Sequence, residues 1–370
     1  MKMKRGIVGI LVTVMVLSCC LVGCGGQEGN ADGDAVNTPQ EKIVWKVQGY
    51  TPAETLYDFY GSRLAENITT MSQGRLTIEW YPADTIVPSV DGPQAVRDGV
   101  LDAVFDYSGM WSSIEYAAPL FCSSPGLFSN PADLVAWIDY GGGRELYQEL
   151  GDKIGVHIEP AGVHDMENFL WANKPIDSIE ALKSVKLRMM PIMGEILAAN
   201  GCNVVFMSAG EIVPSMERGV IDAGEYSIPA LDETFGFQDV AQYYMRPGFH
   251  QPTATQQLAI NQKKWDELPD DLKRIVQVAC KENQMYMMND AAARSIDAMK
   301  RFEEMGKTLV VMPPEMLQTL QEWTDAWYEE KVKEDPYLAR IRESQVEFLK
   351  WWAPYSQTKH MDYPAWALGE

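Results

Sequence analysis

Two stretches of this chain repeat one pattern, and the repeat constrains the fold more than any other feature. Residues 97–103 read R-D-G-V-L-D-A and residues 217–223 read E-R-G-V-I-D-A, with their glycines 120 positions apart. Each stretch is typical of a helix end, a terminating glycine and an entering strand. Equivalent units at domain-sized spacing predict two related α/β lobes, although short echoes of this kind also arise by chance in α/β chains.

Strand and helix patterns alternate after residue 42, which favours an α/β fold with largely parallel sheets. Ile43–Val47 predicts a strand, and Thr51 followed by a proline predicts a helix start. Residues 270–305 contain neither Gly nor Pro and predict a helix about 50 Å long, enough to run across two lobes. A short strand at 308–312 and a helix at 315–332 should follow, the latter with a buried stripe of Leu317, Leu320, Trp323 and Trp327.

The N-terminus has the pattern of an export signal. Basic residues precede an uncharged apolar run at Ile7–Val22, which is short for a membrane-spanning helix. Leu21–Cys24 reads L-V-G-C and resembles the lipobox of bacterial lipoproteins, which implies cleavage after residue 23 and a lipid on Cys24. We therefore expect a signal peptide (1–23), a flexible tether (24–42) and an extracytoplasmic, lipid-anchored protein. An ordinary secretory signal, or Cys19 as the lipidated residue, is the alternative.

Charge and cysteine usage exclude several classes of protein. The formal net charge of −21 opposes binding to nucleic acid and to anionic lipid surfaces. Cys122, Cys202 and Cys280 are too few and too widely spaced for a disulfide framework or a zinc cluster, and we expect buried free thiols. The sequence contains no phosphate-binding loop, H-E-x-x-H or G-x-S-x-G motif. We therefore expect a protein that is not an enzyme.

Eight segments of the chain have a pattern in common with one known family: 56–60, 74–79, 95–103, 140–147, 176–188, 206–212, 216–226 and 260–269. Together they resemble the solute receptors of tripartite ATP-independent periplasmic (TRAP) transporters of the DctP type. The resemblance is closest to the branch that binds 2-oxo acids and lactate. It implies a two-lobed, periplasmic-binding-protein-like α/β fold with a ligand cleft between the lobes and long C-terminal helices. It also implies lobe closure on a small organic acid and delivery to a membrane permease.

The same resemblance divides the chain into approximate lobes. Lobe I is expected to comprise residues 43–165 and 254–300. Lobe II is expected to comprise residues 166–253 and 301–345, followed by a C-terminal extension at 346–370. In α/β sheets ligands bind beyond the carboxyl ends of strands, which places Asp106–Ser108 and Glu225–Ser227 near a shared cleft.

Arg188 is the first candidate for ligand binding, because it ends a predicted strand and a guanidinium can hold a carboxylate bidentately. The resemblance implies this role for the matching arginine. It also implies that Glu225 and the backbone carbonyl of Tyr226 hold a Na⁺ or Ca²⁺ that touches the ligand. Tyr226 stands where that branch has tryptophan, so the pocket wall should gain a hydroxyl. An ordinary ion pair for Glu225 with a nearby lysine remains open.

Glu167 is the main departure from the family pattern, since it falls where the branch carries a metal-ligating glutamine. Asp165 and Asn168 are its rivals for this position, and a solvated acidic loop is the alternative. Two carboxylates at one site would repel each other and require a cation. This arrangement favours Ca²⁺ over Na⁺, or else a ligand that carries an ammonium group.

Aromatic and polar residues should form the cleft walls, and the candidates are Tyr107, Trp111, Phe249 and His250. Each of these is also compatible with a core position. Three functions remain open on this reading: a receptor for a small monocarboxylate, a binding lipoprotein for an amino acid or other amine, and an extracytoplasmic hydrolase using Glu167 and Glu225.

Overall fold

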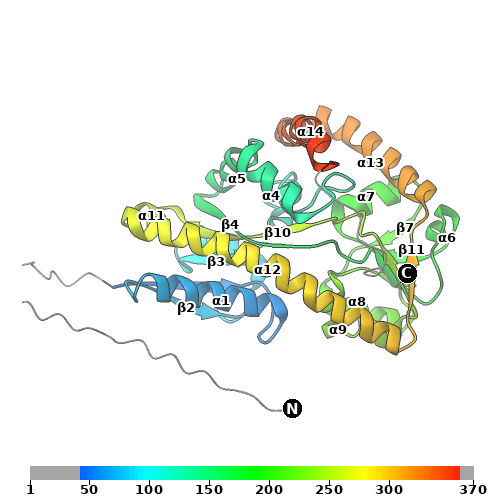
Figure 1. The fold of residues 1–370 in the computed structure, drawn as a ribbon, viewed down its shortest axis with the longest axis horizontal. Coiled ribbons are helices and arrows are strands. Elements are labelled where there is room, and N and C mark those ends of the chain that lie inside the picture. The colour runs from blue at the N-terminus through cyan, green and yellow to red at the C-terminus, as the bar shows by residue number, and fades with distance from the viewer. Residues whose placement is uncertain (1–41, 359–370) are drawn as a thin grey trace, which may run out of the picture. The chain divides into compact units, whose positions relative to one another are not determined.

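The computed structural model describes residues 42–358, which form two β-sheets with helices packed around them (Figure 1). The predicted signal peptide, Cys24 and residues 24–41 of the predicted tether lie outside the described residues. Among the described helices, none is both long enough and apolar enough to cross a membrane.

Sheet A has five strands in the order β2-β1-β3-β10-β4. β1 is parallel to β2 and β3, whereas β10 runs antiparallel to both of its neighbours. Its strands are β1 (Ile43–Gly49), β2 (Leu76–Tyr81), β3 (Ala103–Asp106), β4 (Val156–His164) and β10 (Ala254–Asn261). The helices between these strands are α1 (Leu56–Met71), α2 (Gly92–Arg97), α3 (Pro119–Cys122), α4 (Pro131–Tyr140) and α5 (Gly143–Asp152), with 3₁₀ turns η1 (Ser89–Asp91) and η2 (Ser108–Trp111).

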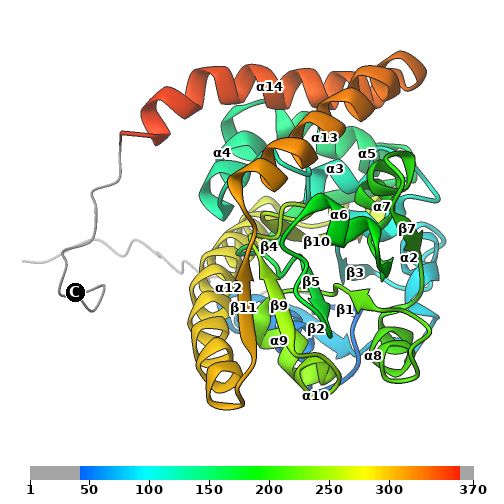
Figure 2. The same cartoon turned by 90° about the vertical axis from the view of Figure 1, so that its right-hand side faces the viewer.

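Sheet B has six strands in the order β11-β9-β5-β8-β6-β7. Figure 2 shows β11, β9 and β5 side by side in this sheet. β6 is parallel to β7 and β8, whereas β5 runs antiparallel to β8 and β9. Its strands are β5 (Leu170–Ala172), β6 (Lys186–Arg188), β7 (Asn203–Val205), β8 (Ala223–Gly224), β9 (Tyr243–Arg246) and β11 (Thr308–Val311). Its helices are α6 (Ile179–Lys183), α7 (Pro191–Ala199), α8 (Ala209–Glu217), α9 (Pro229–Phe235) and α10 (Phe237–Val240).

Both sheets contain the same β-α-β-α-β unit, with its third strand beside its first. In sheet A the unit is β1-α1-β2-α2-β3, and in sheet B it is β6-α7-β7-α8-β8. Each unit then receives an antiparallel strand from elsewhere in the chain, β10 in sheet A and β5 in sheet B. The sheets are mixed rather than largely parallel, because the chain crosses from one to the other three times, at 165–169, at 247–253 and through 262–307.

The repeated sequence pattern corresponds to one repeated structure. Gly99 and Gly219 follow α2 and α8 with φ of 75° and 69°, in the left-handed region that favours glycine. Asp102 and Asp222 then stand before β3 and β8. The Asp102 carboxylate accepts from the Lys46 N–H at 2.8 Å, and the Asp222 carboxylate accepts from the Lys186 N–H at 2.8 Å. The repeated pattern thus corresponds to the same carboxylate-to-backbone hydrogen bond between neighbouring strands in both sheets.

The long C-terminal helices agree with the sequence prediction. α12 (Asp270–Glu304) follows α11 (Gln262–Asp266) and packs on β4 and α1 beside sheet A and on α9 beside sheet B. α13 (Pro314–Glu334) and α14 (Pro336–Ser356) follow β11. Within the predicted stripe of α13, Leu320 is buried and the other three side chains pack against the same core. Cys122, Cys202 and Cys280 are buried free thiols, as expected.

The predicted start of the first helix is wrong by four residues. Thr51 does not cap a helix, because the chain turns first and Glu54 adopts a φ of 66°. Thr55 is the capping residue, and its hydroxyl accepts from the Asp58 N–H at 3.3 Å. Leu56 therefore opens α1, and the intervening turn leaves Tyr50 and Thr51 beside the cleft.

Candidate functional site

A cavity of about 300 Å³ lies where strands of both sheets end. From sheet A it is lined by Tyr50, directly after β1, and Tyr107, directly after β3. From sheet B it is lined by Met190, shortly after β6, and Tyr226, shortly after β8. The cavity thus sits at the carboxyl ends of the parallel strands, where ligands bind in α/β sheets.

Arg188 ends β6 and holds Glu225, the first residue after β8. Its Nη1 donates to the Glu225 carboxylate at 2.6 Å and to the Glu225 backbone carbonyl at 3.0 Å. Its Nε donates to the carbonyl of Met207 at 3.3 Å, and Nη2 meets the Met190 sulfur, a weak acceptor, at 3.6 Å. Arg188 is only 4% exposed, so these oriented acceptors rather than water stabilise its guanidinium charge.

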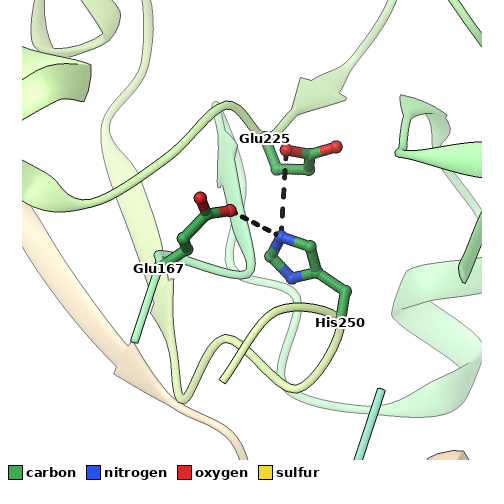
Figure 3. Close-up of side chains that lie close together, drawn as sticks. All are labelled: Glu167, Glu225 and His250. Atoms are coloured by element: carbon green, nitrogen blue, oxygen red, sulfur yellow. Dashed lines mark hydrogen bonds and ion pairs between the residues drawn. The ribbon is translucent and has the colours of Figure 1, made fainter. Parts of the chain in front are cut away.

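Glu167, Glu225 and His250 form a buried cluster (Figure 3). His250 Nε2 lies 3.2 Å from Glu167 Oε2 and 3.8 Å from Glu225 Oε2. The second oxygen of Glu167 accepts from Gln251 at 2.7 Å and from the Ser227 hydroxyl at 3.2 Å. The second oxygen of Glu225 is the one bonded to Arg188.

The first two crossing segments, 165–169 and 247–253, bring this cluster together. Glu167 belongs to the first crossing and His250 to the second, and the Glu167 N–H donates to the Gln251 carbonyl at 3.3 Å. A side chain on Gly248 would place its Cβ 2.3 Å from the Glu167 carbonyl oxygen, so glycine is required for this approach. The Glu167 and His250 side chains, 83 residues apart in sequence, therefore meet through contact between the two segments.

Asp232 in α9 is a buried carboxyl group that contacts residues next to the cluster. It accepts hydrogen bonds from the Asn168 amide at 2.8 Å, the Trp171 indole at 2.8 Å and the Ser227 backbone N–H at 2.9 Å. Burial raises the pKa of Asp232 well above its usual range. This network orients Ser227, whose hydroxyl in turn donates to Glu167.

The cluster is suited to a cation. Glu225 Oε2 is fully buried and, among the described residues, lacks a hydrogen-bond partner. An unpaired buried carboxylate oxygen is costly unless a cation or proton compensates it. Glu225 and Glu167 offer oxygen atoms and His250 offers a nitrogen, and these ligand atoms all lie within 4.8 Å of one another. The residues present therefore fit a bound metal ion, with Glu225 connecting that ion to Arg188.

Six of the eight residues predicted for ligand binding lie at this site. Arg188, Glu225, Glu167 and His250 converge, and Tyr107 and Tyr226 line the cavity. The other two lie elsewhere: Trp111 and Phe249 belong to the hydrophobic core and do not line this cavity. The Trp111 indole instead donates to the buried Asp106 carboxylate at 2.7 Å.

The structure also separates Glu167 from its two rivals. The Asp165 carboxylate accepts from the adjacent Met166 N–H, and the Asn168 amide is bonded to Asp232. Only Glu167, among these three, directs its carboxylate into the cluster. The position of the Tyr226 backbone carbonyl as a metal ligand remains a prediction.

Sequence reasoning missed several residues that line the cavity. Tyr50 and Tyr57 join Tyr107 and Tyr226, so four phenol rings surround the space. Burial raises the pKa of all four above the usual range, which keeps them protonated hydrogen-bond donors. Tyr50 directly follows β1, and this position at a strand end is the signal that could have identified it. Tyr57 lies in α1 and faces the cavity.

Comparison with known proteins gives a consistent result. The model of the DctP family, described as bacterial extracellular solute-binding protein, family 7, matches residues 48–335. A monocarboxylate 2-oxoacid-binding periplasmic protein from Nostoc sp. is 27% identical over 370 residues, covering 99% of each chain.

Two crystal structures of TRAP periplasmic solute-binding proteins are also similar. The first, from Pseudoalteromonas atlantica with bound sodium and pyruvate, has 26% identity and a TM-score of 0.80, covering 86% of this chain and 97% of its own. The second, from Colwellia psychrerythraea with bound calcium and pyruvate, has 26% identity and a TM-score of 0.81, covering 86% of this chain and 98% of its own.

Proposed function

The chain belongs to the DctP family of bacterial extracellular solute-binding proteins, and from this premise we propose that it is the receptor of a TRAP-type transporter. It captures a small monocarboxylate, such as a 2-oxo or 2-hydroxy acid, and delivers it to a membrane permease. The observation that carries this proposal is the buried Arg188–Glu225 pair, which His250 links to the cavity-lining Glu167. The relatives that bind pyruvate together with a cation support it.

In this proposal the ligand and the cation together neutralise the net charge of the buried side chains. Glu167 and Glu225 carry two negative charges and Arg188 carries one positive charge. A divalent cation and a monocarboxylate together bring this buried set to neutrality, whereas Na⁺ would leave one negative charge. The ligand carboxylate is placed between Nη2 of Arg188 and the cation, and the phenols of Tyr107 and Tyr226 face the rest of the ligand.

Thermal unfolding tests the proposal. We expect pyruvate or lactate with Ca²⁺ to raise the midpoint of unfolding, because a ligand that binds only the folded state stabilises it. Arg188→Lys keeps the charge beside Glu225 but loses the bidentate fork, and should lose most of this shift. Arg97→Lys, at an exposed residue paired with Asp98, is the matched control and should keep it. Absence of stabilisation by every carboxylate tested would contradict the proposal.

A second candidate function rests on the position of Glu167. Its carboxylate lines the cavity together with four phenol rings, a setting that also attracts an ammonium group. An amino acid or other amine is then the ligand. Binding that survives Arg188→Lys and disappears in Glu167→Gln would favour this candidate over the monocarboxylate.

We also propose a lipid anchor at Cys24 and lobes divided near residues 165, 253, 300 and 345. The L-V-G-C motif supports the anchor, and the change of sheet at residues 165–169 and 247–253 supports the division. Cys24→Ser should release the protein from the membrane fraction into the soluble fraction. Unchanged fractionation would contradict the anchor without affecting the ligand proposal.

A further inference from the structure

His250 gives the cation site a nitrogen ligand. Its imidazole is 3% exposed, and Nε2 points between the carboxylates of Glu167 and Glu225 (Figure 3). Ca²⁺ and Na⁺ are hard cations that take oxygen ligands, whereas a neutral imidazole favours zinc, cobalt, nickel and similar ions. The donor set of this cluster therefore differs from one built of oxygen atoms alone.

The spacing of the donor atoms suits a small divalent ion. Ligand atoms about 2.1 Å from a tetrahedral metal lie about 3.4 Å from one another. The Nε2 atom of His250 is 3.2 Å and 3.8 Å from the two carboxylate oxygens, with all three atoms within 4.8 Å. Modest side-chain rotations would thus complete a three-residue site with a fourth position open.

Two buried polar atoms of this cluster are available to a ligand. Among the described residues, neither Glu225 Oε2 nor His250 Nδ1 has a hydrogen-bond partner, and both are buried. A metal on Nε2 would take up the Glu225 oxygen and leave Nδ1 as an N–H donor. His250 also lines a separate cavity of about 30 Å³, enough space for one water molecule as an acceptor.

We propose that Glu167, Glu225 and His250 bind a divalent transition-metal ion of the zinc class in preference to Ca²⁺ or Na⁺. This inference rests on the proposed function, because the open position of the metal is the one that the ligand carboxylate occupies. Glu225 links the ion to Arg188, since one carboxylate oxygen faces the cluster and the other accepts from the guanidinium.

The test uses the full chain, freed of metal with a chelator and titrated separately with Co²⁺, Zn²⁺ and Ca²⁺. We expect Co²⁺ and Zn²⁺ to bind at one equivalent and more tightly than Ca²⁺. Bound Co²⁺ should show the visible absorption of a low-coordinate ion with nitrogen and oxygen ligands. His250→Gln should weaken Co²⁺ binding by about tenfold or more, while changing Ca²⁺ binding much less.

His157→Gln is the matched control. His157 also lies beside a carboxylate, Glu159 at 2.8 Å, but in β4 and outside the cluster, and this variant should bind Co²⁺ like the unmodified protein. Glu167→Gln removes a different proposed ligand and should also weaken Co²⁺ binding. It therefore tests the same site if the His250 variant does not fold. Tighter binding of Ca²⁺ than of Co²⁺, or unchanged Co²⁺ binding in His250→Gln, would overturn the inference.

The two proposals fail in different ways. If pyruvate stabilises the protein with Ca²⁺ but Co²⁺ binds weakly, only the metal assignment is wrong. If Co²⁺ binds tightly but stabilisation by carboxylates is absent in the presence of every metal, the metal site stands and the receptor function is wrong.

Discussion

Asp106 is a buried carboxyl group that the ligand cluster does not use. It lies at the end of β3 and accepts hydrogen bonds from Trp111 Nε1 and Gln257 Nε2, both at 2.7 Å. These bonds only partly offset burial, which raises the pKa of Asp106 to about 7. Asp106 directly precedes Tyr107, so its protonation state bears on the cavity wall.

We expect Asp106 to make the fold less stable as the pH rises from about 4 to about 7. In this window the folded state keeps the proton and the unfolded state, with a pKa near 3.9, has released it. The loss is bounded by about 1.4 kcal/mol per pH unit, and it levels off above pH 7. The quantity to measure is the difference in unfolding free energy between the unmodified protein and Asp106→Asn, from urea titrations at several pH values.

Asp106→Asn is a suitable comparison because it can hydrogen-bond to both partners, with the Gln257 amide turned over so that the direction of that bond reverses. The asparagine oxygen can accept from Trp111, and its amide can donate to Gln257 Oε1, which lacks a partner among the described residues. A free-energy difference that does not change between pH 4 and pH 7 would show that Asp106 is not protonated in the folded protein.

At the scale of elements, the turn that joins α8 to β8 requires glycine at position 219 because of its backbone conformation, and not because a side chain would clash. A Cβ on Gly219 would meet nothing within 4 Å, yet its φ of 69° is strained for any residue with a side chain. Gly99 has the same properties in sheet A. The turn matters for the site because β8 leads directly to Glu225.

Gly219→Ala should therefore lower the unfolding free energy by about 1–2 kcal/mol, through backbone strain alone. Gly210→Ala is the matched control, since Gly210 lies inside α8 without positive φ and with open space around its Cα. That change should be neutral or stabilising by up to about 1 kcal/mol. Equal effects of the two substitutions in urea unfolding would contradict the conformational explanation.

Elements with local patterns can be predicted from this sequence, and those decided by distant contacts cannot. α12 and α13 follow from long runs of helix-compatible residues, and the repeat at Gly99 and Gly219 follows from local turn chemistry. β10 is different, because A-T-Q-Q-L-A-I-N places two buried glutamines in a central strand. Gln257 is tolerated there because it bonds to Asp106 across the sheet, a partner that the local sequence does not reveal.

The candidate site shows the same division between local and distant information. Arg188, Glu225 and Glu167 were identifiable from strand ends and from the family resemblance. The meeting of His250 with Glu167 was not, because it depends on the close contact between Gly248 and the first crossing segment. Trp111 and Phe249 belong to the hydrophobic core, since an aromatic residue near a strand end can equally fill the core.

At the scale of the whole molecule, the helix α12 connects the two sheets through contacts with helices on each. α12 carries Glu282, which pairs with Arg63 of α1 at 2.5 Å, and Arg301, which pairs with Glu233 of α9 at 2.5 Å. One helix thus contacts the flanking helices of both sheets, and the chain crosses between the sheets at two further places. Neither sheet consists of one continuous stretch of sequence.

We expect the described part of the chain to unfold in a single cooperative transition. Scanning calorimetry of the full chain should give equal calorimetric and van't Hoff enthalpies. Addition of divalent metal and carboxylate should move the whole transition to higher temperature. Two resolved transitions, only one of which moves with ligand, would show that the lobes unfold independently.

The insertion of β10 beside β3 also has a consequence for protein export. Asp106 and its partner Gln257 are 151 residues apart, and the first five strands of sheet B lie between them in the chain. A chain that leaves the cytoplasm N-terminus first cannot complete sheet A until that intervening stretch has emerged. Pairing over such distances is slow, so translocation can run ahead of folding. In the proposed export of the chain, the order of the strands therefore delays completion of sheet A until most of the chain has emerged.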